Sequence, residues 1–534
     1  MPEARPNFLF ILADDLGFSD IGAFGAEIHT PHLDKLAREG RILTSMYAAP
    51  LPLSRAEALT GASHHLAGMA SMYSAWGAQT HSPNYLRALS PNTATLPETL
   101  REAGYFTAMV GAWHLGDQDA QSPSARGFER SFALLHAAGE RFPPRGDQAA
   151  AGRPPTVYRA DGHIVPAPDA YITDYFTDRL ISYLAAEKSR PFFAYVPYTA
   201  PHFPLQITDA FFARYRGFYD DGFEALRLRR IARQKEIGLF AQEFAPAAPV
   251  AESDTTPRWA SLSCVQKARE ARRMEIYAAM VENLDWNIGR LIEALRAQGR
   301  YDDTCIVFSS CNGAAHAFPE AAENNAFENM GRRDSWIYYT ERWAEASNAP
   351  FSRWKAKTTE GGVAVPGIVR LPRETAGAPP SDAVVTLRDV MPTFLDLAGV
   401  EPPRVQTITG RSMLAHLRGQ APSVHPSDAV FAEECSGEGY VRQGAWKAVV
   451  GTDLTANSFE RNDPAVADHI AALRAGDFRR AKEIRARWPL VWRLYNVRTD
   501  RGETRDLAAM EPQKLAHLQG LYRDYCRANG VVDP

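Results

Sequence analysis

Residues 51–61 read LPLSRAEALTG, a stretch that joins polar chemistry to a helix-forming run. Ser54 and Arg55 bring a hydroxyl group and a fixed positive charge. The following residues 56–59 are good helix formers, which predicts a helix after the arginine. Leu51, at the front of the stretch, carries no nucleophilic atom.

A second informative stretch lies upstream, where the apolar run Phe8–Ala13 is bounded by Pro6 and by Asp14-Asp15. A run of this length is typical of a buried parallel strand. Ligands of open α/β sheets lie at the carboxyl ends of such strands. Asp14 is therefore either the N-cap of a following helix or part of a site together with Asp15.

Polar residues also follow three later predicted strands. These strands are residues 106–110 before His114, 191–197 before His202, and 304–309 before Cys311 and Asn312. Helices are predicted from residue 31, over 96–105, 171–187 and 267–299, and within a charged insertion at 211–260. The alternation of strands and helices predicts an α/β fold.

The last part of the chain has a different pattern. Short strand candidates lie near residues 430, 440, 446 and 492, and a helix is predicted over 512–529. This pattern suits a small antiparallel sheet with a C-terminal helix. We expect a large domain over residues 1–410 and a C-terminal subdomain over 411–534. Residues 137–168, rich in Gly, Pro and polar residues, are predicted to form a long excursion over the mouth of the site.

Composition narrows the classes of function. The 534 residues have a net charge of -4 and 23% charged residues, which argues against a nucleic-acid partner or a polybasic membrane anchor. The five cysteines are scattered and odd in number, which fits neither a zinc finger nor a disulfide framework. No apolar run approaches the ~18 residues of a membrane span. We therefore expect a cytoplasmic protein.

Residues 51–61 resemble the signature segment of the type I sulfatases, in particular the bacterial arylsulfatases of the alkaline phosphatase superfamily. In that family the segment runs Cys-x-Pro-Ser-Arg, then four residues, then Thr-Gly. The cysteine is converted to formylglycine, whose aldehyde hydrate attacks sulfur. Here Leu51 stands at the cysteine position, while the residues in register are Ser54, Arg55, Thr60 and Gly61. The resemblance implies an α/β fold with a large mixed sheet flanked by helices and a smaller C-terminal antiparallel sheet domain.

The resemblance also implies two sets of site residues. The metal set is Asp14, Asp15 and Asn312, with Cys311 at the position of a further family aspartate. The set around the anion and the nucleophile, which we assign as catalytic together with Cys311, is Arg55, His114, His202 and Lys355, with Lys357 as the alternative lysine. Ala112 replaces a family lysine, and we expect the adjacent His64 and His65 to be structural.

The altered metal set changes the expected ion. Calcium takes six or more oxygen ligands, so exchanging a carboxylate for the thiol of Cys311 weakens a calcium site. The remaining donors suit a softer divalent metal, and zinc, iron and copper are the candidates. Cys311 itself is either a thiolate stabilised by neighbouring cations or a small inert residue that fills the altered site.

Three functions remain open for a sulfatase-like chain without formylglycine. The preferred one is an enzyme repurposed to a non-sulfatase reaction on an anionic or aromatic small molecule, with or without a bound metal. The second is a non-catalytic pseudo-sulfatase that binds an anionic ligand. The third is residual hydrolysis of sulfate esters by a metal-activated water. No nucleic-acid or membrane partner is expected, and the oligomeric state stays open.

Overall fold

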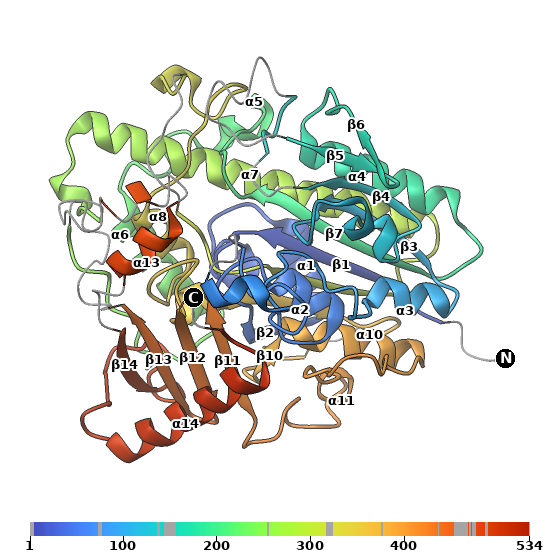
Figure 1. The fold of residues 1–534 in the computed structure, drawn as a ribbon. Coiled ribbons are helices and arrows are strands. Elements are labelled where there is room, and N and C mark those ends of the chain that lie inside the picture. The colour runs from blue at the N-terminus through green and yellow to red at the C-terminus, as the bar shows by residue number, and fades with distance from the viewer. Residues whose placement is uncertain are drawn as a thin grey trace.

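The computed structural model describes residues 5–72, 77–135, 139–143, 156–253, 256–316, 324–374, 378–435, 437–452, 468, 471–472, 477–485 and 490–532. These residues form a 10-stranded sheet and a separate 4-stranded sheet. The large sheet lies at the centre of the molecule, and the small sheet packs below it in the view of Figure 1.

The large sheet has the strand order β10-β2-β9-β8-β1-β7-β3-β4-β5-β6. Its strands are β1 (Asn7–Asp14), β2 (Arg41–Tyr47), β3 (Phe106–Ala112), β4 (Arg130–Leu134), β5 (Tyr158–Ala160), β6 (His163–Val165), β7 (Phe192–Pro201), β8 (Thr304–Ser310), β9 (Ala364–Arg370) and β10 (Val385–Thr386). The central pairs of β1 with β7 and β8 are parallel, whereas β9 runs antiparallel to β8 and β2. The sheet is therefore mixed, as the resemblance implied.

Strand β1 shows why the sheet needs cover on both faces. All eight of its residues are buried. Successive side chains of a strand point to opposite faces. Leu9 and Ile11 enter one apolar cluster, while Phe8 and Phe10 enter the other. Each cluster needs its own layer of helices.

Helices supply those two layers (Figure 1). One apolar cluster contains residues of α1 (Pro31–Glu39), α4 (Ile172–Ala186) and α7 (Cys264–Ala297). The other contains residues of α2 (Ser54–Thr60), α3 (Leu96–Glu102), α10 (Val390–Ala398) and α11 (Leu414–Leu417). The remaining short helices of this region are α5 (Asp209–Phe212), α6 (Phe223–Glu236), α8 (Glu341–Ser347), α9 (Glu360–Val363), η1 (Gly22–Phe24), η2 (Gly77–His81), η3 (Asp119–Gln121), η4 (Ser124–Arg126), η5 (Ala213–Tyr215), η6 (Trp259–Ser261), η7 (Phe327–Asn329) and η8 (Leu387–Asp389).

The small sheet is antiparallel, with the order β11-β12-β13-β14. Its strands are β11 (Val430–Cys435), β12 (Glu438–Gln443), β13 (Trp446–Thr452) and β14 (Leu490–Asn496), and the accompanying helices are α13 (Phe478–Arg485) and α14 (Pro512–Ala528). Val441 and Leu494 pack with Leu518 of α14, while Tyr440 and Val449 pack with Tyr47 of the large sheet. These contacts confirm the predicted sheet and helix. The boundary between residues 410 and 411 stays a prediction.

Two sequence expectations differ from the structure. The insertion at 211–260 is predicted to be helical, but in the described residues between the end of α6 and residue 260 the one helical element is the short turn η6. Pro246, Pro249 and Pro257 lie there, and proline removes a helical hydrogen bond and clashes with the preceding turn. Within 137–168, the described residues 158–165 form the β5–β6 hairpin at the edge of the large sheet. Residues 144–155 of the predicted excursion lie outside the described residues.

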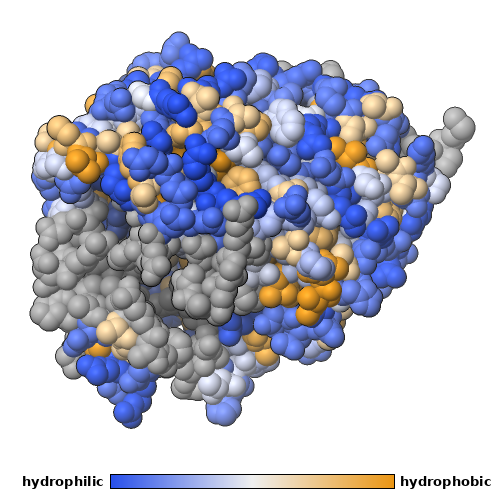
Figure 2. All heavy atoms as spheres, turned by 90° about the horizontal axis from the view of Figure 1, so that it is seen from above, coloured by the Kyte–Doolittle hydropathy of each residue, from blue (hydrophilic) through white to orange (hydrophobic). Residues whose placement is uncertain are grey.

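The outer surface of the molecule is mixed. Hydrophilic residues cover most of the face in Figure 2, and its apolar residues gather in small groups. Among the described residues, the structure contains no helix that is both long and apolar enough to span a bilayer.

Candidate metal and anion site

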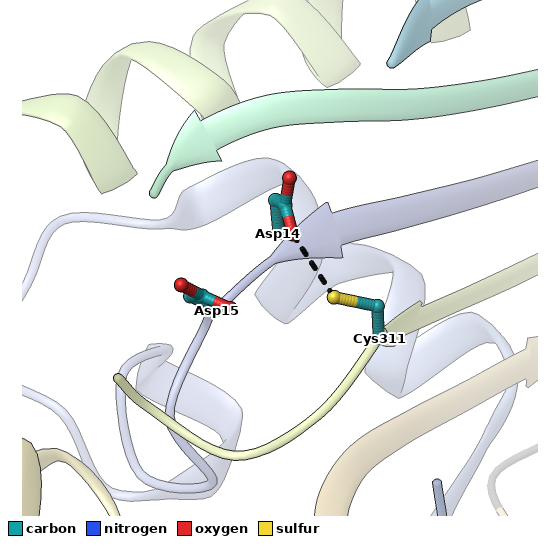
Figure 3. Close-up of side chains that lie close together, drawn as sticks. All are labelled: Asp14, Asp15 and Cys311. Atoms are coloured by element: carbon teal, nitrogen blue, oxygen red, sulfur yellow. Dashed lines mark hydrogen bonds between the residues drawn. The ribbon is translucent and has the colours of Figure 1, made fainter. Parts of the chain in front are cut away.

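The predicted site residues come from segments far apart in the chain. Asp14 ends β1, Cys311 directly follows β8, and His202 directly follows β7. Since these strands are parallel neighbours, their carboxyl ends meet at one edge of the sheet. Figure 3 shows the Cys311 side chain pointing toward Asp14 at the tip of β1, with Asp15 in the turn that follows.

Two of the predicted site residues, Asp15 and His114, have an unusual backbone conformation. Asp15 has φ 65° and His114 has φ 60°, a left-handed conformation that few residues other than glycine adopt. Such conformations cost on the order of 1–3 kcal/mol and cluster at functional sites. The turn after β1 and the turn after β3 are thus held in shapes that local sequence preference alone does not favour.

The Asp14 carboxylate is fully buried between a cation and a thiol. Arg55 Nη2 lies 3.0 Å from Asp14 Oδ2, with both side chains fully buried. Cys311 Sγ lies 3.1 Å from Asp14 Oδ1. Burial by itself raises the pKa of Asp14, but the charges of Arg55 and Lys355 outweigh it and hold that pKa well below its ordinary value. Asp14 is therefore a carboxylate at neutral pH.

Asp15 binds the second cation of the cluster. Lys355 Nζ lies 2.7 Å from Asp15 Oδ1 and 3.0 Å from Oδ2. Asn312 Nδ2 donates to Asp15 Oδ1 at 2.8 Å, and His202 Nε2 lies 3.4 Å from Oδ2. Burial lowers the pKa of Lys355, but Asp15 and Asp14 more than reverse this and raise it. Two carboxylates and two cations thus balance one another.

Cys311 is fully buried. Burial raises the pKa of its thiol, and Asp14 raises it further. Arg55 and Lys355 act in the opposite direction but leave it well above the ordinary value. Among these protein groups alone, the thiol is favoured over the reactive thiolate.

The donor set can still accommodate a metal ion. Ligand atoms of Asp14, Asp15 and Cys311 lie within 4.8 Å of one another, a spread that fits bonds of about 2.0–2.3 Å to one ion. Two carboxylates, one sulfur and the neighbouring Asn312 amide oxygen suit zinc or iron better than calcium, which prefers an all-oxygen shell.

The two histidines near this cluster are neutral donors or acceptors. His202 Nδ1 donates to the Phe203 carbonyl at 2.6 Å, which directs Nε2 toward Asp15. Burial lowers the pKa of His202. Burial, Arg55 and nearby positive groups lower the pKa of His114 to about 3. Neither ring carries a charge at neutral pH.

The Sulfatase family model matches residues 6–400 of the chain. This chain belongs to the sulfatase family. It is 36% identical to an uncharacterized sulfatase of Schizosaccharomyces pombe, over 99% of this chain and 94% of that protein. It is 34% identical to an arylsulfatase of Klebsiella aerogenes, over 75% of this chain and 88% of that protein. The structure of Ps i-CgsB in complex with k-i-k-neocarrahexaose resembles it with a TM-score of 0.66 and 24% identity, covering 98% and 92% of the two chains. That likeness confirms the fold.

Sulfatases usually bind a divalent metal, and the chain's acidic cluster is compatible with one. The beginning of the signature segment contacts the surroundings of that cluster at two points, Pro50 and Ser54. The Pro50 carbonyl accepts a 2.7 Å hydrogen bond from Ala356 N, next to Lys355. The Ser54 hydroxyl donates to the Cys311 carbonyl. Leu51, between these two anchors, is 7% exposed and packs in an apolar cluster with Leu53.

The two candidate lysines of this chain, Lys355 and Lys357, have different partners. Lys355 contacts Asp15 and its side chain is 17% exposed, whereas Lys357 pairs with Glu438 of the small sheet at 3.1 Å. Glu360, three residues later, is bound by Lys447 at 2.8 Å and by Arg501 at 3.0 Å. Glu503 accepts from Glu360 N at 2.8 Å and from the same Lys447 at 2.8 Å. The small sheet and its flanking loop therefore hold the segment that carries Lys355.

Sequence reasoning missed Arg141. This side chain is fully buried, and its Nη2 donates to the carbonyls of His202 at 2.7 Å and Phe203 at 3.0 Å. Burial lowers the pKa of Arg141, and Tyr171, Asp14 and Asp15 act against that. Arg141 lies in a Gly- and Pro-rich stretch without a motif, so no local pattern marked it.

Proposed function

We propose that this sulfatase homologue is repurposed for a reaction other than formylglycine-dependent hydrolysis, on an anionic, aromatic small molecule. The observation that carries the proposal is Leu51. Its neighbours Pro50 and Ser54 contact the segments of Lys355 and Cys311. We therefore infer that Leu51 stands where the family places the residue that becomes formylglycine, and a leucine cannot attack an ester.

The proposed ligand is anionic because of the groups that reach the site edge. Lys355 is the most exposed charged member of the cluster, with 17% of its side chain accessible. His202 and His114 add neutral hydrogen-bonding groups. An aromatic ligand follows from the likeness to the Klebsiella aerogenes arylsulfatase. We assign Arg55, His114, His202 and Lys355 to ligand binding and catalysis.

We further propose that Asp14, Asp15, Cys311 and Asn312 hold a divalent metal of the zinc or iron class. Such an ion would supply Lewis-acid chemistry at this edge of the sheet. It would also compete with Arg55 and Lys355 for the carboxylates, which frees the Lys355 ammonium for an anion.

The activity test uses an aryl sulfate. Protein co-expressed with a formylglycine-generating enzyme should show no turnover of nitrophenyl sulfate near the ~1 s⁻¹ typical of enzymes. Leu51→Cys alone should restore little, because Ala112 and Cys311 remain. Turnover at an enzymatic rate by the unaltered chain would contradict the proposal.

The binding test compares two lysines. Calorimetry of zinc-loaded protein with phenyl phosphonate should show at least ~10-fold weaker binding in Lys355→Met. Lys357→Met is the matched control, since Lys357 is bound to Glu438, and it should bind the anion as the wild type does. Equal weakening in both variants would argue against Lys355 as an anion ligand.

The metal test follows alkylation of Cys311 by mass spectrometry. Labelling should speed up when zinc is removed by a chelator, because a metal-bound sulfur is protected. Exposed Cys264 is the internal control whose labelling should not change. Equally slow labelling of Cys311 in both states, in protein without metal, would make Cys311 an inert packing residue.

A second candidate function is a non-catalytic anion-binding protein. It is favoured by one observation: the two carboxylates already pair with Arg55 and Lys355 at 3.0 and 2.7 Å. A site balanced in this way has little electrostatic need for a dication. Anion binding that is unchanged by chelation, with no metal in the purified protein, would select this candidate.

A further inference from the structure

A second buried polar cluster lies where the large domain meets the small sheet. Its members are Glu57 of α2, His64 and His65 just beyond α2, Arg388 of η8, and Glu433 and Glu434 of β11. Glu57 is 1% exposed, His64 is fully buried and Glu433 is 2% exposed. Ligand atoms of Glu57, His64 and Glu433 lie within 4.8 Å of one another. This cluster contains no residue of the site proposed above.

Each of the two adjacent histidines has one ring nitrogen that makes no hydrogen bond within the described residues, Nε2 in His64 and Nδ1 in His65. His65 Nε2 lies 3.0 Å from Glu434 Oε2 in hydrogen-bonding geometry. His64 Nδ1 lies 3.2 Å from the Met69 carbonyl, which can only accept, so Nδ1 carries the proton. Burial lowers the pKa of His64, which favours the neutral ring, whose Nε2 presents its lone pair to Glu433 Oε2, 3.2 Å away. Within the described residues this Nε2 makes no hydrogen bond.

Two electron-rich atoms at that separation repel each other unless a cation lies between them. The same tautomer, with the far ring nitrogen donating to a backbone carbonyl, is the usual arrangement of a metal-bound histidine. Oε1 of Glu57 likewise makes no hydrogen bond within the described residues.

The formal charges of the cluster also favour a bound cation. Three carboxylates, Glu57, Glu433 and Glu434, face the single guanidinium of Arg388, which leaves a formal charge of -2. Buried carboxylates are costly unless they are paired or bound to a metal. A divalent cation would neutralise the cluster.

We propose that Glu57, His64 and Glu433 bind a divalent transition-metal ion of the zinc class, at the joint between α2 and β11. The ligands are one neutral imidazole and two carboxylates, a set that zinc accepts. Arg388 contacts Oε1 of Glu433 and lies 3.3 Å from Oε1 of Glu57. It therefore orients both carboxylates while Glu433 Oε2 remains directed at His64. The ion would tie the large domain to the small sheet.

The test measures zinc binding to the full chain, purified without a histidine tag, by competition with a chromophoric chelator. The wild type should bind one zinc ion that His64→Gln binds at least ~10-fold more weakly. His65→Gln is the matched control and should keep that ion. Glu57→Gln preserves the shape of the side chain and should weaken zinc binding as His64→Gln does. A loss in both variants would not be explained by misfolding of one of them.

Cobalt separates this site from the one that contains Cys311. Cobalt bound to a thiolate gives an intense charge-transfer band in the near ultraviolet, whereas the Glu57–His64–Glu433 set contains no sulfur. The His64-dependent ion should therefore lack that band, and it should persist in Cys311→Ser. Anomalous scattering from zinc-soaked crystals should place it beside Glu433. Equal zinc affinity in the two histidine variants, or no zinc bound by the wild type, would overturn the proposal.

Discussion

Arg55 and Glu57 stand two positions apart on helix α2 and face two different buried clusters. At 3.6 residues per turn, such positions point about 200° apart. On the Arg55 side, two carboxylates meet two cations. On the Glu57 side, three carboxylates meet one guanidinium. One short helix thus supports a balanced cluster and an unbalanced one. The two should differ in how far an added dication restores the stability lost with a positive charge.

The largest expected effect is on the balanced side. Arg55→Met should lower the free energy of unfolding by about 3–5 kcal/mol, because it leaves the Asp14 carboxylate buried without its partner. Urea unfolding at pH 7 in the presence of a chelator measures this loss. A loss below about 1 kcal/mol would mean that Asp14 finds another partner, and the contrast between the clusters would fail.

The corresponding change on the unbalanced side is Arg388→Met. It should cost about 3 kcal/mol in chelator, since it removes the guanidinium that, in the described part of the chain, contacts both Glu57 and Glu433. Zinc should recover part of this loss, because it neutralises the same carboxylates. In a Cys311→Ser background, which weakens the metal set around Asp14, zinc should recover less of the loss in Arg55→Met. The same urea experiment, with and without zinc, provides the comparison. Equal responses to zinc would show that the clusters do not differ in their need for a cation.

Acid should act on the balanced cluster through His114. Its folded pKa of about 3 lies below the ordinary value of 6.5, so the unfolded chain binds the additional proton between these values. The contribution of the neutral His114 ring to the free energy of unfolding is fully present above pH 6.5. It declines as the pH falls toward 3. His114→Gln should flatten this decline by about 1 kcal/mol per pH unit below pH 6. If the free energy of unfolding falls with pH in parallel for the variant and the wild type, His114 does not contribute to the acid sensitivity.

The smallest expected effect comes from a surface pair that serves as a baseline. Arg233 Nη1 lies 2.7 Å from Glu236 Oε1, with side chains 51% and 67% exposed. Arg233→Ala should change the free energy of unfolding by no more than about 0.5 kcal/mol, because water screens exposed charges. A larger change would indicate that global electrostatics, rather than the buried clusters, dominate stability in this chain.

The sequence predicts the fold, and it predicts that the strand-end residues of the Asp14 cluster lie at one edge of the sheet. The apolar run before Asp14-Asp15 and the strand before Cys311 each predict where their polar residues lie, because parallel strands end at a common edge. The choice between Lys355 and Lys357 could not be made with equal clarity. Both lie in one irregular segment, and they are separated by tertiary contacts, Lys355 with Asp15 and Lys357 with Glu438.

The second cluster was beyond the reach of sequence patterns. His65 and Glu434 are 369 positions apart, and nothing local to either residue indicates that they meet. His64 and His65 were expected to be structural, and no neighbouring residue distinguishes the nitrogen that is satisfied from the one that is not. Arg141 was missed for the same reason, since its hydrogen bonds to the His202 region join segments with no common motif.

The attachment of the Lys355 segment to the small sheet sets the order in which the site matures during synthesis. Glu360 is anchored by Glu503, which lies 143 positions further along the chain. A ribosome adds about 5–20 residues per second, so the strands that carry Asp14, His202 and Cys311 are complete about 10–40 s before that anchor emerges. During this interval the nascent chain already has the residues of the acidic cluster but lacks the support for its lysine. A chain shortened before residue 503 would stay in that state.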